Sequence, residues 1–101
     1  MDRGTGSVGV RYYDIDGQPI TMDEWAERFK DNRVALEERG DVSVSTVWLG
    51  LDHQYGDGPP LIFETMIFGG EHDQDQWRYS TREGALAGHA AAVALVFGVS
   101  P

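Results

Sequence analysis

Between Arg33 and Tyr79 the chain carries four segments with β-strand character and no helical pattern, and this run limits the available folds more than any other feature. The segments are residues 33–38, 42–51, 61–68 and 77–79. Parallel strands need a crossover of about a dozen or more residues, and the connections from residue 39 onward have hairpin length instead. The run therefore predicts an antiparallel sheet.

A helix is expected on each side of this run. Thr21 and Glu24 have the spacing of a capping box, and Ser80 and Glu83 repeat it before a helix over residues 81–97. The predicted core faces are Met22, Trp25 and Phe29 in the first helix and Leu86, Ala90, Val93 and Phe97 in the second. With a short strand near residues 10–15, the expected order is β-α-β-β-β-β-α. This order indicates an α+β fold with an antiparallel sheet of four to five strands and both helices packed on one face.

The length of 101 residues fits one domain, with residues 1–8 as a flexible lead-in and 9–101 as a single α+β unit. The chain has no cysteine, which excludes disulfides and thiolate metal sites. Stability must then come from the core, or from the core together with a partner subunit. No signal peptide and no membrane-length apolar stretch is visible, so we expect a cytoplasmic protein without membrane contact.

The charge is strongly acidic and unevenly placed. Seventeen acidic residues against eight basic ones give a net charge of −9, and no Lys or Arg lies between Arg39 and Arg78. Such a surface repels phosphates, so direct nucleic-acid binding is not expected. It suits a partner protein with a basic surface, although the simpler alternative is that the charge only keeps the chain soluble. The predicted contact residues are Asp52, Tyr55, Asp57, Glu71, Asp73 and Asp75.

The strongest candidates for catalysis are Asp52, His53 and Glu64, on a long connection and the strand after it. Glu64 lies among large apolar residues, where a carboxylate needs a partner. It is either a general base or ligand near His53, or half of a cross-strand ion pair with Arg11 or Arg78. His72 follows the far end of that strand, roughly 20 Å from His53 at the usual rise per residue, so one site containing both is not expected. We predict no metal and no cofactor.

The last helix presents two further features. Gly84, Gly88 and Ala92 recur every four residues, which favours close packing on the chain's own sheet or, as the alternative, a homodimer through residues 81–97. His89 is expected to be a hydrogen-bonded packing residue. In the second segment, apolar residues on both faces indicate a central strand or a bulge near Thr46.

Three stretches resemble a family of small uncharacterised proteins from tailed phages of actinobacteria: residues 11–25 (RYYDIDGQPITMDEW), 44–70 (VSTVWLGLDHQYGDGPPLIFETMIFGG) and 79–96. The resemblance implies a phage accessory protein in a bacterial cytoplasm and assigns no functional residue. The expected function is a non-enzymatic protein-interaction module that acts on a host or phage protein. The alternative is a small enzyme or ligand-binding protein with its site around Asp52, His53 and Glu64.

Overall fold

The computed structural model describes residues 11–51 and 58–98. Its elements are β1 (Tyr12–Tyr13), β2 (Pro19–Ile20), α1 (Met22–Phe29), β3 (Arg33–Arg39), β4 (Val42–Trp48), β5 (Phe63–Phe68), β6 (Gln76–Tyr79) and α2 (Arg82–Phe97). The α+β class and the antiparallel sheet are confirmed. The first predicted strand forms a separate small antiparallel sheet, in which β1 pairs with β2 around the Asp16-Gly17 turn.

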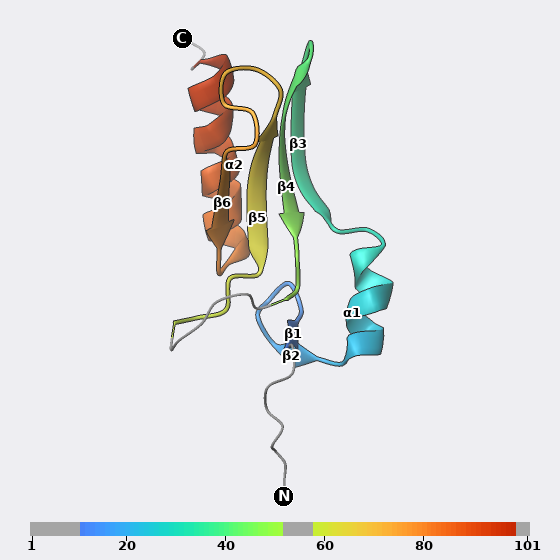
Figure 1. Ribbon diagram of the computed structural model, residues 1–101. Coiled ribbons are helices and arrows are strands. Elements are labelled where there is room, and N and C mark those ends of the chain that lie inside the picture. The colour runs from blue at the N-terminus through green and yellow to red at the C-terminus, as the bar shows by residue number, and fades with distance from the viewer. Residues whose placement is uncertain (1–10, 52–57, 99–101) are drawn as a thin grey trace, which may run out of the picture.

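The main sheet has four strands in the order β3-β4-β5-β6, each antiparallel to its neighbour, and α2 lies along one face (Figure 1). β4 is central, as predicted. The bulge belongs to β3, because the register shifts between Arg33 and Ala35 opposite Val47 and Thr46. Strand β4 therefore alternates without interruption, with Val44, Thr46 and Trp48 buried on the α2 side.

Helix α1 begins at the predicted capping box, in which the Thr21 hydroxyl accepts from the Glu24 amide and the Glu24 carboxylate accepts from the Thr21 amide. The prediction that both helices pack on one face of the sheet holds for α2 only. Helix α1 contacts β1 and lies beyond the end of the main sheet (Figure 1). Two helical turns are too short to cross the sheet. Trp25 joins α1 to the core by donating from Nε1 to the Leu49 carbonyl at 2.8 Å, while Met22 stays 58% exposed.

The predicted face of α2 is half right, because Val93 and Phe97 pack against the core while the most deeply buried positions are small residues. Ala85 and Ala92 are buried, whereas Leu86 and Ala90 are exposed. A Cβ at Gly88 would clash with the Oη, Cζ and Cε1 atoms of Tyr79, so the missing side chain lets helix and sheet approach. The structural interpretation of the small-residue spacing is thus confirmed. The cap also lies one residue later than predicted.

The N-cap of α2 is Thr81, whose hydroxyl accepts from the Gly84 amide at 2.9 Å.

The core beneath α2 consists of two clusters. One contains Trp48, Ile62, Phe63 and Ala85, and the other Val44, Ile67 and Ala92. Neither helix within 11–51 and 58–98 has the length and apolar character needed to cross a membrane.

Candidate functional site

Glu64 lies on the face of the sheet opposite α2 and faces Arg78 directly across β5 and β6. The Arg78 Nε donates to Glu64 Oε2 at 3.0 Å, with the two side chains 33% and 13% exposed. The sequence left Glu64 as either a general base near His53 or half of a cross-strand ion pair, and the ion pair with Arg78 is the one present. The Arg78 guanidinium occupies Oε2 of this carboxylate, so the structure accounts for Glu64 as half of an ion pair.

The other proposed members of that site, Asp52 and His53, lie outside the described residues, as do Tyr55 and Asp57. A catalytic group built from Asp52, His53 and Glu64 therefore remains a prediction. Within the described part of the chain, no three His, Asp or Glu side chains gather closely enough to hold a metal ion.

The acidic residues Glu71, Asp73 and Asp75 lie exposed in the connection between β5 and β6. This loop is held by its own hydrogen bonds. Asp73 Oδ1 accepts from the Gly69 amide at 2.6 Å, and the His72 ring is 3.2 Å from Asp75 Oδ2. The carboxylates are therefore carried by an ordered loop of fixed conformation.

A fourth acidic residue, Asp41, belongs to the hairpin that packs against this loop. Gly69 has a φ of 87° and packs so closely against the Asp41 carbonyl that a Cβ could not be accommodated. The tip of the β3–β4 hairpin thus lies next to the β5–β6 loop, at the end of the sheet where α2 finishes (Figure 1). Asp41 is exposed and adds its carboxylate to those of the loop. We call Asp41, Glu71, Asp73 and Asp75 the acidic end.

Below α2 a chain of polar side chains crosses the core. Thr46 Oγ1 is 2.5 Å from Thr65 Oγ1 and 2.8 Å from His89 Nδ1. Both threonines are fully buried, so no substrate reaches their hydroxyls. Burial lowers the pKa of His89, and the negative charge of Glu37 partly offsets that effect by raising it. His89 is a hydrogen-bonded packing residue, as expected, and its partner is Thr46. The only sequence signal for this contact was the position of Thr46 in a central strand.

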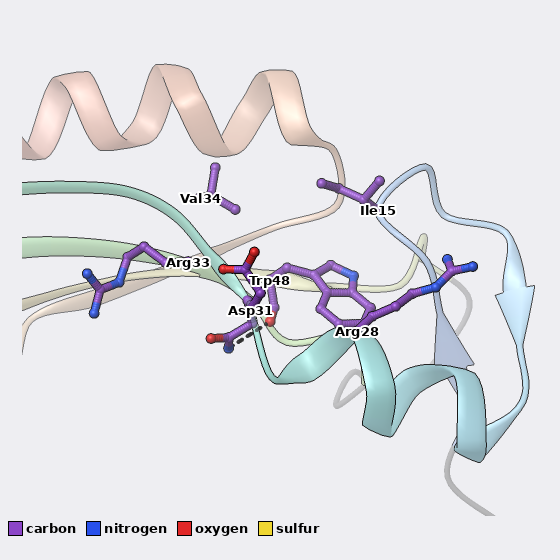
Figure 2. Close-up of a pocket in the computed structure, with 7 residues that line it drawn as sticks. Ile15, Arg28, Asp31, Arg33, Val34 and Trp48 are labelled. Atoms are coloured by element: carbon purple, nitrogen blue, oxygen red, sulfur yellow. Dashed lines mark hydrogen bonds between the residues drawn. The ribbon is translucent and has the colours of Figure 1, made fainter.

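A pocket of about 220 Å³ lies where α1, the start of β3 and the end of β4 meet (Figure 2). Its lining residues are Ile15, Arg28, Asp31, Asn32, Arg33, Val34 and Trp48. The Asn32 side-chain amide donates to the Trp48 carbonyl at 3.1 Å and so ties the chain entering β3 to the end of β4. This pocket was not predicted from the sequence. The one indication was the position of Trp48 on the buried face of a central strand.

The pocket is an apolar depression with charges at its margin. Figure 2 shows the guanidinium groups of Arg28 and Arg33 directed to opposite sides, so the two cations do not converge on one point. Arg28 faces Asp14 at 3.8 Å. Trp48 Nε1 is buried and has no hydrogen-bond partner among the described residues. Because the atom is closed off from solvent, a ligand in the pocket would not reach it. The arrangement offers no nucleophile with a base beside it.

Comparison with known protein families, with characterised proteins and with solved structures gives no match to this chain.

Proposed function

We propose that the chain is a non-enzymatic protein-interaction module that binds a basic surface of another protein through its acidic end. The observation that carries the proposal is the convergence of two hairpins, which places the backbone of Asp41 against Gly69, at the start of the loop that carries Glu71, Asp73 and Asp75. Carboxylates on ordered loops meet a complementary surface with little loss of conformational freedom. Grouped charges of one sign also accelerate encounter with a partner of opposite charge.

Among the described residues, His72 lies beside the acidic end, with its ring 3.2 Å from Asp75 Oδ2, whereas the nearby cation Arg39 is bound elsewhere. Arg39, the basic residue at the end of β3, has its Nε 3.1 Å from Glu37 Oε2, and its guanidinium lies 4.7 Å from the centre of the Phe97 ring. These two contacts occupy Arg39 on the α2 side of the sheet. Its charge is thereby directed to Glu37 and not to the carboxylates of the acidic end.

The biological setting follows from the resemblance described above. On that basis the chain is a phage accessory protein in the cytoplasm of a bacterial host, and its partner is a host or phage protein with a basic surface, such as a component of host defence. The ion pair that Glu64 forms with Arg78 accounts for this carboxylate without a catalytic role, which supports binding as the proposed activity.

The test is a pull-down from actinobacterial lysate with the tagged chain, read by mass spectrometry and repeated with two double variants. Glu71→Lys/Asp75→Lys reverses charge at the acidic end and spares Asp73, which holds the loop through the Gly69 amide. Glu27→Lys/Asp31→Lys makes the same change of net charge at exposed positions on the other end of the molecule. Far-UV circular dichroism checks that both variants fold.

We expect one stoichiometric partner with the wild type and with Glu27→Lys/Asp31→Lys, and at least a tenfold loss with Glu71→Lys/Asp75→Lys. The captured amount should fall as salt is raised, because exposed charges are screened beyond about 8 Å at physiological ionic strength. Equal loss with both variants would mean that net charge alone acts. Retention by Glu71→Lys/Asp75→Lys would place the contact elsewhere.

A further inference from the structure

The two edges of the main sheet differ in how they are protected. The outer edge of β3 carries a bulge at Val34 and the charged residues Glu37, Glu38 and Arg39, which are common devices against edge-to-edge pairing. Strand β6 has neither. Its sequence is Gln-Trp-Arg-Tyr, and its one charge, on Arg78, is directed inward to Glu64. Within the described residues no strand pairs with the outer side of β6.

The free hydrogen-bonding groups of β6 can be identified from its register. The Asp75 carbonyl accepts from the Ile67 amide of β5 at 3.0 Å. Because amide directions alternate along a strand, Trp77 and Tyr79 also bond toward β5, and the N–H and C=O groups of Gln76 and Arg78 point outward. The outer edge of β6 therefore offers two donors and two acceptors.

An apolar groove of about 290 Å³ runs beside this edge, between β6 and α2. It is lined by Trp77, Tyr79, Gly88, Ala91, Ala92 and Leu95. Trp77 is 40% exposed and Leu95 51% exposed. Large apolar side chains at an open sheet edge mark a surface that another chain covers.

We propose that a second copy of this chain pairs with β6 across a two-fold axis through Trp77, joining the two main sheets into one and closing the two grooves against each other. In this register Gln76 of each copy exchanges both backbone hydrogen bonds with Arg78 of the other, which satisfies the outward groups of both strands. Trp77 then stands opposite its own equivalent on the α2 face, as a close cross-strand aromatic pair.

The distribution of charge favours a second copy of this chain as the partner at this edge, and it favours the register centred on Trp77. Copies of net charge −9 repel one another, so they can approach closely only through a surface with few charges. Residues 84–97 contain no Asp, Glu, Lys or Arg, and His89 on that stretch is turned inward to Thr46. A register centred on Arg78 would set two guanidinium groups opposite each other, which is unfavourable. Centring on Trp77 avoids this.

The expected interface is small. Helix α2 is about 24 Å long at the usual rise, and one helix flank with one short strand covers less than the ~800 Å² per partner of a standard interface. We therefore expect a dimer that dissociates on dilution.

The experiment is sedimentation velocity of the purified full chain from about 1 to 200 µM, a range chosen because small interfaces typically bind weakly. The wild type should shift from the monomer mass of 11.2 kDa to twice that mass as concentration rises. Trp77→Lys removes the aromatic pair. Gln76→Pro removes an outward N–H and no bond to β5, so it leaves the sheet's own ladder complete. Phe68→Lys is the control, at an exposed apolar residue on the helix-free face.

We expect Trp77→Lys and Gln76→Pro to weaken self-association at least tenfold, with Phe68→Lys unchanged. A wild type that stays at 11.2 kDa throughout overturns the proposal, as does a dimer that survives Gln76→Pro or is lost with Phe68→Lys. If Trp77→Lys fails to fold by circular dichroism, Gln76→Pro decides the question alone. The result is independent of the acidic end, because no partner protein is present.

Discussion

Replacing Gly88 by alanine should destabilise the protein, although the same change in an ordinary helix stabilises it. Alanine is favoured over glycine by about 1 kcal/mol in a helix interior. Here the new Cβ would clash with the Oη, Cζ and Cε1 atoms of Tyr79, at distances well below van der Waals contact. The conflict is with a ring, because Tyr79 packs against the cluster of Trp48, Ile62, Phe63 and Ala85 and cannot rotate away freely.

The expected magnitude follows from these two opposing effects. Overpacking a well-filled site typically costs about 1–3 kcal/mol, and contact with a rigid ring puts Gly88→Ala at the upper end of that range. Subtracting the gain in helix propensity leaves a net loss of about 2 kcal/mol in the free energy of unfolding. The helix must either lift from the sheet or displace the phenol ring.

Urea unfolding followed by far-UV circular dichroism measures this loss, at one protein concentration for all variants. Two controls in the same helix separate the contributions. Ala90→Gly, at an exposed position, should lose about 1 kcal/mol through propensity alone. In Gly84→Ala the new Cβ would lie 3.0 Å from the Thr81 hydroxyl and 3.8 Å from the Tyr79 Cβ, the latter an ordinary van der Waals contact. This variant should stay within about 0.5 kcal/mol of the wild type because the propensity gain offsets the tighter contact. A Gly88→Ala variant as stable as the wild type, or more so, would refute the packing of α2 on Tyr79.

Two further predictions concern the charged and polar groups. A double-mutant cycle with Glu64→Gln and Arg78→Gln should give a coupling of about 0.5–1 kcal/mol, since the pair is partly exposed, and a coupling near zero would show that the ion pair does not form in solution. Because burial lowers the pKa of His89 below its ordinary 6.5, the unfolded chain takes up a proton more readily than the folded one. Stability should therefore fall as pH drops below 6.5 toward the folded pKa, and thermal midpoints should show a shallower fall for His89→Gln in that window; equal slopes would contradict the buried position of the ring.

The type and order of most elements were predictable because their signals are local. The Thr21–Glu24 capping box, the turn at Gly40 and the alternation along β4 each depend on residues within a few positions of one another. Such signals predicted α1, the edge strand β3, the central strand β4 and the antiparallel pairing of the sheet. They could not place α1 beyond the sheet, since its position is set by contacts of Trp25 with distant residues.

Candidate sites were less predictable, because they combine residues from separate elements. Glu64 could be assigned as either a lone carboxylate or a paired one, and the cross-strand register with Arg78 decided between them. Likewise Thr46 meets Thr65 and His89 at separations of 19 and 43 residues. No local pattern connects these side chains.

The sequence by itself determined the α+β class, the run of strands, the cap of α1 and the acidic charge, since each depends on composition or on neighbouring residues. Only the tertiary structure decided which side of α2 meets the sheet. That helix is apolar nearly all round, so hydrophobic periodicity does not single out a buried face. Steric fit selects it instead: Tyr79 occupies the space that only Gly88 leaves open, and this contact turns the large residues Leu86 and Leu95 outward.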